Sequence, residues 1–595
     1  MKILYKDGTV AECPVEEELQ VLRHSTAHVM AQAIKRLFPQ ADFAYGPATE
    51  RGFYYDVDLG DTKLTDEDLA NIEAEMKKIV KENLPVKAYI LPRPEAIKLM
   101  EERGEKYKVE HIGDLDEDAE ISFYQQGEYI DMCTGPHVCY TKALKAFKIT
   151  GQSGAYWKND KNNKMLTRIN GVAFRSQQEL DEFVKQQEEA KARDHRKIGK
   201  DMKLFMTDDL IGKGLPMFLP NGYIIWQELE DYIKAKERKL GYLHVLTPCV
   251  GTVNLYRTSG HWDHYRANMF PMMQVEDEEF VLRPMNCPHH MMIYANQKHS
   301  YKDLPIRIGE IAHDFRFEQS GTLKGIERGR HFCQNDAHLF VTPEQIKDEV
   351  GSVVNLIFDV YKDFGITDYR CVLSLRDPAD KVKYHQDDAM WEKAESALRE
   401  VLVELGVNFT EEIGEAAFYG PKLDVNVQPA IGAEYTLSTC QLDFCLPAKF
   451  NLTYIDKDGS EKTPVVLHRA ILGSLDRFMA YLIEETKGIF PVWLAPLQAK
   501  ILCLPNTDTT FAKEVYDKLS DAEVRCKLDD RNETIGYKIR EARQVDRAPY
   551  MIILGAKEIE TKTLSVRELK TDKTTSYTVD EFIAKITNEI KNRTI

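Results

Sequence analysis

The sequence lacks the features that mark membrane-bound, secreted or disulfide-stabilised proteins. Its longest apolar runs, such as Phe478 to Ile483, fall far short of the roughly 20 residues that a membrane-spanning helix needs. The start, MKILYKDGTV, reaches Asp7 after only a few apolar residues, unlike a secretory leader. The 11 cysteines are odd in number, scattered and without a CxxC pair, which indicates reduced thiols. The sequence therefore predicts a cytoplasmic protein without a membrane span.

The chain also lacks the excess of positive charge that many nucleic-acid-binding proteins carry. Its formal net charge of -17 at pH 7, taken alone, disfavours a polyanionic partner. Two stretches, 185–203 and 525–547, nevertheless collect Lys and Arg. Each of them alone is more simply explained as a solvated helix face. Charge therefore leaves the question of a nucleic-acid partner open.

Length and composition favour a multidomain protein. A chain of 595 residues with 43% apolar and 29% charged residues is long enough for about three to four domains of ordinary soluble character. Its first 20 residues predict at most one hairpin, around the turn Lys6-Asp7-Gly8. From Val21 onward, apolar residues recur at helical spacing.

One stretch, 307–340, combines a predicted hairpin with cationic residues. Residues 308–317 and 330–340 read as two strands, and the loop between them is rich in glycine. Arg316 and Arg328 offer planar guanidinium groups to phosphate oxygens, and Glu318 offers a carboxylate to a base edge. The hairpin could therefore clamp a nucleotide. An exposed salt-bridged hairpin is the alternative if these residues are taken alone.

A second candidate site combines histidines with a cysteine. His24 and His28 stand four residues apart on the predicted helix, so both rings can face one cleft. Cys133 and His137 stand four apart on a turn much later in the chain. These four are plausible zinc ligands by type, although two polar helix histidines are the simpler explanation of the first pair.

Several motifs together resemble one enzyme family. Arg-Phe-Glu at 316–318, the loop, Arg328 and the run QNDAH at 334–338 resemble motif 2 of the class II aminoacyl-tRNA synthetases. Nearly all of residues 21–595 is similar to the threonyl-tRNA synthetase family. The other motifs that carry this resemblance are MNCPHH at 285–290, YGPK at 419–422, QLDF at 441–444 and HRAILGSLDR at 468–477.

The resemblance implies an α+β multidomain fold. A class II antiparallel sheet flanked by helices would carry catalysis, with an α+β editing domain before it and a C-terminal α/β anticodon-binding domain after it. The helix at 223–239 and the strand at 242–248 resemble motif 1, which implies a homodimer. The implied domains are an N-terminal stub (1–20) in place of the ubiquitin-like module of most bacterial members, the editing domain (21–183), a helical linker (184–203), the catalytic domain (204–495) and the anticodon-binding domain (496–595).

By the same resemblance Cys287, His338 and His468 are zinc ligands. Their spacing is too long for a zinc finger, and without the resemblance each would be read as a core residue. Three protein ligands leave zinc an open position, which threonine fills in this family with its amino and hydroxyl groups. Serine keeps that hydroxyl, so it escapes rejection and a hydrolytic editing site is needed. The implied threonine-binding residues are Gln334, Asp336, Tyr419 and Gln441.

The resemblance also assigns residues to ATP, which should bind with Mg²⁺. Arg316 is expected on the α-phosphate, Glu318 on the adenine, and Arg328 and Arg477 on the outer phosphates. Lys422 would reach the amino-acid carboxylate or the α-phosphate. Cations at these positions neutralise the charge that develops as pyrophosphate leaves.

Two further sites follow from the family. The editing site would consist of His24, His28, Cys133 and His137, helped by Lys108 and Asp131, and would hydrolyse Ser-tRNA without a metal by general-base chemistry. The anticodon of tRNA(Thr) would be read by polar edge contacts from the C-terminal domain. The residues implied there are Asn532, Glu558 and Arg567.

Three positions depart from the family pattern. Thr436 stands where a glutamine is usual, and Cys333 and Asn335 replace the commoner Thr and Asp. They suggest an active variant enzyme, such as a second copy tolerant of an inhibitor. The leading hypothesis is a threonine–tRNA ligase. The alternatives are a hydrolase that only edits and a non-enzymatic tRNA-binding paralogue with a regulatory role.

Overall fold

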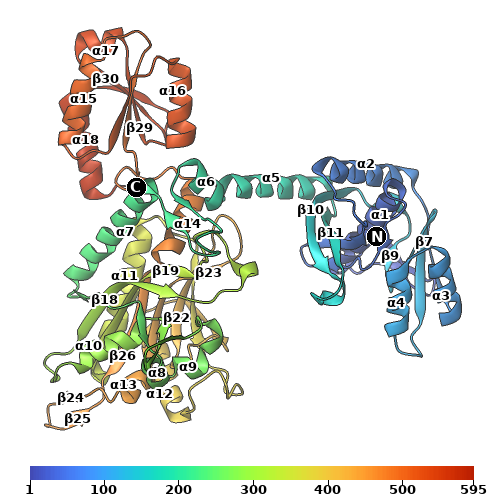
Figure 1. Ribbon diagram of the computed structural model, residues 1–595, viewed down its shortest axis with the longest axis horizontal. Helices are drawn as coiled ribbons and strands as arrows, with labels where there is room; N and C mark the ends of the chain where they lie inside the picture. The colour runs from blue at the N-terminus through green and yellow to red at the C-terminus, as the bar shows by residue number, and fades with distance from the viewer. Residues whose placement is uncertain (595) are drawn as a thin grey trace. The chain divides into compact units, whose positions relative to one another are not determined.

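The computed structural model describes residues 1–594 (Figure 1). The chain divides into two compact units, Met1–Glu189 and Ala190–Ile595, which are considered separately below. Among the described residues, no helix combines the length and the apolar character that crossing a bilayer requires.

The first unit is built on a long helix packed against a sheet. Helix α1 (Glu18–Leu37) buries most of its middle, including Val29, Met30 and Ile34, against strands β5 and β11. Helix α2 (Asp66–Glu82) is capped by Thr65, which forms a capping box with Asp68. The sheet has the order β10-β11-β5-β3 with β4 beside β5, and its strands are β3 (Asp42–Phe43), β4 (Ala48–Thr49), β5 (Gly52–Asp58), β10 (Ala146–Tyr156) and β11 (Met165–Phe174).

Two smaller sheets complete this unit. The predicted N-terminal hairpin forms, and its first strand also pairs with β9, where Leu4 lies opposite His137. The N-terminal residues thus extend the sheet that carries one of the candidate editing residues. These elements are β1 (Lys2–Leu4), β2 (Val10–Glu12) and β9 (His137–Val138), then β6 (Val86–Leu91), β7 (Ile121–Gln126) and β8 (Tyr129–Met132) with helices α3 (Arg93–Glu102) and α4 (Lys106–Asp114).

The charged segment expected as one helical linker forms two helices. Helix α5 (Gln177–Arg193) begins earlier than predicted, and α6 (His195–Asp201) follows. The break falls at Asp194, whose side chain accepts a hydrogen bond from the Arg196 N–H at 2.8 Å and so caps α6.

The largest sheet of the second unit has eight strands in the order β14-β18-β19-β26-β23-β22-β20-β21. All neighbours are antiparallel except β14 with β18 and β20 with β21. The predicted hairpin forms as β18 and β19. The strands are β14 (Leu243–His244), β18 (Ile306–Phe315), β19 (His331–Val341), β20 (Tyr369–Leu375), β21 (Phe409–Ile413), β22 (Lys422–Val427), β23 (Tyr435–Asp443) and β26 (Val465–Ser474).

Helices α7, α11 and α14 form the core with one face of this sheet, which leaves the other face for a site (Figure 1). The strand expected at 242–248 is reduced to Leu243–His244. The helices are α7 (Pro220–Lys239), α8 (Val253–Ser259), α9 (His261–His264), α10 (Cys287–Ala295), α11 (Ile346–Asp363), α12 (Asp388–Glu404), α13 (Cys445–Lys449) and α14 (Leu475–Thr486). Short strands are β12 (Phe205–Met206), β13 (Met217–Phe218), β15 (Val250–Thr252), β16 (Met273–Val275), β17 (Glu278–Leu282), β24 (Tyr454–Ile455) and β25 (Glu461–Lys462).

The C-terminal part forms a five-stranded sheet in the order β28-β27-β29-β30-β31. The parallel core of three strands agrees with the sequence, but the antiparallel pair β30–β31 and two helices were not predicted. Strand β31 is polar and mostly exposed, so it lacks an apolar alternation. The elements are β27 (Ala499–Cys503), α15 (Thr510–Asp521), β28 (Cys526–Asp529), α16 (Ile535–Glu541), β29 (Tyr550–Leu554), α17 (Ala556–Thr561), β30 (Thr563–Glu568), β31 (Thr574–Thr578) and α18 (Val579–Asn592).

Candidate functional site

Three residues far apart in sequence meet on the free face of the largest sheet of the second unit. His338 and His468 lie directly opposite each other in the β19–β26 ladder. Cys287 is the first residue of α10. All three are buried, and their ligand atoms lie within 4.8 Å of one another. The sheet register therefore assembles the predicted metal-binding triad.

The ring nitrogens of both histidines fit metal binding. Asp443 Oδ2 lies 2.8 Å from His468 Nε2, and Nδ1 of that ring is buried with no hydrogen-bond partner in residues 1–594. His290 Nδ1 lies 2.8 Å from His338 Nδ1, and His338 Nε2 likewise lacks a hydrogen-bond partner among the described residues, with Asp336 Oδ2 3.9 Å away. Metal-bound histidines typically use one nitrogen for the metal and give the other to a hydrogen-bond partner. The two unpartnered nitrogens and the thiol thus form a three-ligand site.

A cavity of 360 Å³ adjoins this triad and contains the predicted threonine-binding residues. The Tyr419 hydroxyl donates to Gln441 Oε1 at 2.5 Å, and the Tyr419 ring stacks on His468 at 4.7 Å between centroids. Asp336 is buried at the same place, and burial raises its carboxyl pKa to about 6. Gln334 also lines the cavity.

A second cavity, of 240 Å³, holds the predicted nucleotide-binding residues Arg316, Glu318, Arg328, Arg477 and Lys422. The two cavities share lining residues. They are therefore adjacent, with cationic side chains at their boundary. The shared residues are Arg316, Gln334, Lys422, Thr439 and Gln441.

Three cations of the second cavity already have protein partners. Arg328 Nε lies 3.0 Å from Glu318 Oε2, and Arg477 Nε donates to the Glu327 carbonyl at 3.2 Å. Lys422 pairs with Asp424. Burial lowers the pKa of the Arg477 guanidinium, which favours an anion beside it.

The positions that depart from the family pattern lie on both faces of the sheet. Thr436 lines the nucleotide cavity, and its hydroxyl donates to Asn426 Oδ1 at 2.8 Å. Cys333 and Asn335 alternate with the cavity residues of β19, so they face the opposite side. There the Asn335 side chain donates to Glu237 Oε1 at 2.8 Å.

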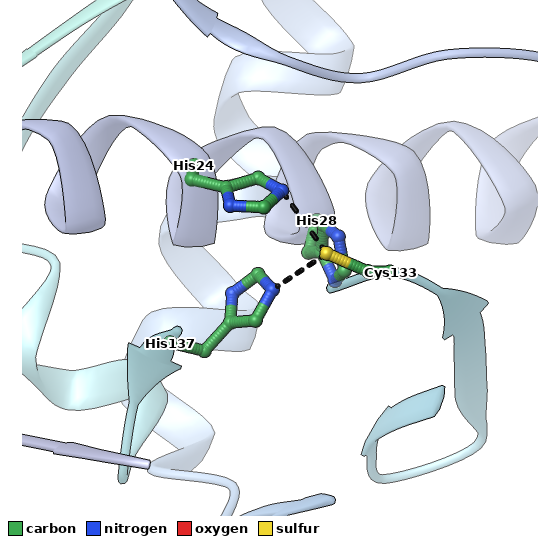
Figure 2. A group of neighbouring side chains, drawn as sticks. All are labelled: His24, His28, Cys133 and His137. Atoms are coloured by element: carbon green, nitrogen blue, oxygen red, sulfur yellow. Dashed lines mark hydrogen bonds between the residues drawn. The ribbon is translucent and has the colours of Figure 1, made fainter. Parts of the chain in front are cut away.

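In the first unit the four candidate editing residues converge, as Figure 2 shows. His24 and His28 project from α1, while Cys133 follows β8 and His137 lies on β9. Cys133 Sγ is 3.1 Å from His24 Nε2 and 3.3 Å from His137 Nε2. A cavity of 650 Å³ opens beside them.

Lys108 and Asp131, the two predicted helpers, form a buried ion pair in this cavity. Lys108 Nζ lies 2.7 Å from Asp131 Oδ1, and Asp131 Oδ2 lies 3.4 Å from His28 Nε2. The Tyr55 hydroxyl donates to the same carboxylate at 2.5 Å. Tyr55 carried no sequence signal, because a tyrosine in an apolar strand reads as core.

The electrostatics of this cluster keep its imidazoles in the neutral, proton-accepting form. Burial lowers the pKa of His24 to about 4 and lowers the pKa values of His28 and His137 well below the usual range. Burial also raises the pKa of Cys133 to about 12. At neutral pH the imidazoles are therefore uncharged and can accept a proton from water.

The three predicted anticodon-binding residues lie on different parts of the C-terminal domain, with Asn532 after β28, Glu558 in α17 and Arg567 on β30. Asn532 is exposed after β28, Glu558 accepts the Gly555 N–H at 3.0 Å, and Arg567 pairs with Asp572 at 2.9 Å. Within residues 1–594 no hydrogen bond or ion pair joins any two of the three. The structure thus places them in one domain without linking them.

Family models match three parts of the chain. Residues 121–170 match the threonyl and alanyl tRNA synthetase second additional domain, 267–486 the class II tRNA synthetase core domain (G, H, P, S and T), and 492–589 the anticodon binding domain. The sheet, its two adjoining cavities and these matches define a class II aminoacyl-tRNA synthetase with an editing domain.

Relatives that match nearly the whole chain identify the family more narrowly. The chain is 52% identical to the threonine–tRNA ligase of Geobacillus sp. (strain WCH70), over 99% of this chain and 92% of that one. It is 51% identical, over the same shares, to that of Listeria monocytogenes serovar 1/2a. The chain belongs to the threonine–tRNA ligase family.

A solved structure agrees with this placement. The RNA binding domain of threonyl-tRNA synthetase from Cryptosporidium parvum Iowa II superposes with a TM-score of 0.63 at 36% identity, covering 66% of this chain and 98% of that chain. The activity is ATP-dependent ligation of threonine to tRNA, accompanied by editing.

Proposed function

We propose that the two adjacent cavities activate L-threonine with ATP and transfer it to tRNA(Thr), and that the histidine–cysteine cluster of the first unit hydrolyses Ser-tRNA(Thr). The observation that carries the first part is the buried triad with its two unpartnered nitrogens, beside a cationic nucleotide cavity. The proposed location of the protein is the cytoplasm.

The metal of the triad is proposed to be zinc, held by Cys287 Sγ, His338 Nε2 and His468 Nδ1. Bound zinc supplies open coordination positions for an amino group and a hydroxyl, which valine cannot fill. Asp336 is placed to accept a hydrogen bond from the threonine hydroxyl. Tyr419 and Gln441, which already bond each other, orient the substrate from the opposite wall.

The proposed roles in ATP binding follow from the protein partner or the cavity position of each cation. Arg328 bonds Glu318 in the free protein, so nucleotide binding exchanges this pair for phosphate on Arg328 and the adenine edge on Glu318. Arg316 lines both cavities, where it can reach an α-phosphate, and Arg477 faces the outer phosphates. Lys422 lies at the junction for the carboxylate or the α-phosphate. Mg²⁺ accompanies ATP.

In the editing cluster, we assign water activation to the neutral imidazoles of His24, His28 and His137, with Cys133 shaping the pocket. The Lys108–Asp131 pair orients His28 and supplies positive charge near an ester oxygen. No step of this hydrolysis requires a metal.

The proposed assembly is a homodimer. Apolar residues after α7, in the segment matching motif 1, remain exposed: Leu243 at 63% and Leu246 at 88%. An exposed apolar cluster of this kind marks an interface. The proposed domains keep the boundaries 21–183, 204–495 and 496–595, and in the last of them Asn532, Glu558 and Arg567 are proposed to contact the anticodon.

The first test is ATP–pyrophosphate exchange with threonine, serine and valine. We expect strong exchange with threonine, exchange reduced by roughly 10–200-fold with serine for the lost methyl, and a reduction of about 10⁴-fold or more with valine. Equal exchange with valine would show that the hydroxyl is not recognised. Absence of exchange with all three would favour a protein that only edits.

A second test concerns the turn that presents Cys133 and His137. Gly135 has a φ of +66°, and a Cβ there would lie 1.9 Å from the Tyr124 hydroxyl oxygen. Gly135→Ala should therefore displace the turn and slow hydrolysis of Ser-tRNA(Thr) by about 10²-fold, the lower end of what a misplaced base costs. Gly113→Ala, where a Cβ meets nothing within 4 Å, is the control and should hydrolyse normally.

A further inference from the structure

A second group of soft ligands lies on the hairpin, away from the catalytic triad. His313 on β18 lies directly opposite Cys333 on β19, and His331 lies opposite Phe315 in the same ladder. Since side chains alternate along a strand, Cys333 faces away from the side on which Gln334 and Asp336 line the cavities. The cluster of His313, His331 and Cys333 therefore lies behind the nucleotide site.

The three ligand atoms are close enough to share one ion. His313 Nδ1 lies 3.0 Å from His331 Nε2 and 3.1 Å from Cys333 Sγ, and all three atoms lie within 4.8 Å of one another. Nitrogen and sulfur ligands of one tetrahedral zinc stand roughly 3.3–3.7 Å apart, given zinc–ligand bonds of about 2.0–2.3 Å. An opening of about half an ångström would therefore seat the ion. Cys333 Sγ is also 4.0 Å from His313 Nε2, so a rotation of the His313 ring can bring either of its nitrogens toward the sulfur.

Without a cation the cluster has a hydrogen-bonding conflict. His313 Nδ1 faces both a nitrogen and a thiol, yet one nitrogen of a neutral imidazole makes only one strong hydrogen bond, as donor or as acceptor, so one of the two contacts stays weak. A cation bound by all three atoms would give each of them a strong partner.

The backbone holds the ligands in position. The Cys333 N–H donates to Asp476 Oδ2 at 2.7 Å, and the His313 carbonyl accepts from Arg283 Nε at 2.7 Å. Both partners are buried. Two ligands are thus fixed on adjacent strands before any ion arrives, which reduces the entropy lost on binding.

We propose that His313, His331 and Cys333 bind a zinc-like soft cation, separate from the catalytic metal. One thiol and two imidazoles are a ligand set that zinc favours over Mg²⁺ or Ca²⁺. The carboxylate of Glu230 acts electrostatically on both His313 and Cys333 and can contribute to charge balance. The ion would cross-link β18 and β19 just before the loop that carries Glu318 and Arg328.

The test is the zinc content of the full-length protein, stripped with a chelator under reducing conditions, reloaded with Zn²⁺ and desalted. We expect about two zinc ions per chain in the wild type. Cys333→Ser and His331→Ala should each retain one, and Cys287→Ser should also retain one. Cys371→Ser removes an equally buried thiol outside both clusters and should keep two.

Cobalt distinguishes the two sites. In Cys133→Ser/Cys287→Ser loaded with Co²⁺, a thiolate-to-cobalt charge-transfer band can come only from the proposed cluster among the metal-binding groups of residues 1–594, and it should vanish when Cys333→Ser is added. One zinc per chain in the wild type, unchanged in Cys333→Ser and His331→Ala, would overturn the proposal. So would the absence of the band in Cys133→Ser/Cys287→Ser. The catalytic triad is tested independently, because only the Cys287→Ser variant removes one of its ligands.

Discussion

Cys287→Ser is expected to lower threonine-dependent ATP–pyrophosphate exchange by about 10³-fold, since a Lewis-acid contribution of roughly 4 kcal/mol is lost with the metal. The structure gives the reason. His338 Nε2 and His468 Nδ1 are buried without hydrogen-bond partners in the described part of the chain, and a serine hydroxyl cannot replace the thiolate as a third ligand. Amino-acid recognition should fail while the nucleotide cavity remains intact.

Two measurements make this expectation specific. Binding of ATP, measured by equilibrium dialysis, should stay within about threefold of the wild type, because Arg316, Arg328 and Arg477 keep their surroundings. Cys371→Ser should leave exchange unchanged, since Cys371 lies on β20 away from both cavities. Full exchange in Cys287→Ser would show that the thiol is not needed for threonine activation. Selection of threonine would then depend on Asp336 and Gln441.

Much of this site could be predicted from sequence because it depends on backbone register. The hairpin at 307–340 has apolar alternation on both strands, and the family motifs fixed the positions of His338 and His468. Once these strands pair, the two histidines must lie opposite each other. The separation of 130 residues between them carries no signal of its own, so only the resemblance connected them.

What the sequence could not provide are contacts made by ordinary residues. Asp443, His290 and Tyr55 determine which nitrogen or oxygen of a site residue is free, yet each is a common residue in an apolar strand or helix. Likewise His313, His331 and Cys333 seemed separate in sequence, because their proximity depends on a strand pairing and on ring orientation. The strand at 242–248 was predicted too long, since only Leu243–His244 pairs as a strand and Leu246 and Pro248 beyond it are exposed.

His24→Ala is expected to slow hydrolysis of Ser-tRNA(Thr) by about 10²–10⁴-fold, the usual contribution of a general base. Its imidazole lies 3.1 Å from Cys133 Sγ at the edge of the editing cavity. Exchange with threonine should not change, because the catalytic sheet belongs to the other unit. The matched control is His111→Ala, since His111 lines the same cavity but contacts Tyr45 instead of the cluster.

The pH dependence tests whether the base is a buried, neutral imidazole. Burial lowers the pKa of His24 to about 4, so the ring stays in its active, neutral form as the pH falls from 7.5 to 5.5. The ratio of wild-type to His24→Ala hydrolysis rates should then be nearly constant over this range. An exposed histidine, with a pKa of about 6.5, would keep only about a tenth of its neutral form at pH 5.5, and the ratio would fall about tenfold. A fall of that size would mean that water or a conformational opening solvates His24 during the reaction, and it would contradict a base that stays buried and neutral.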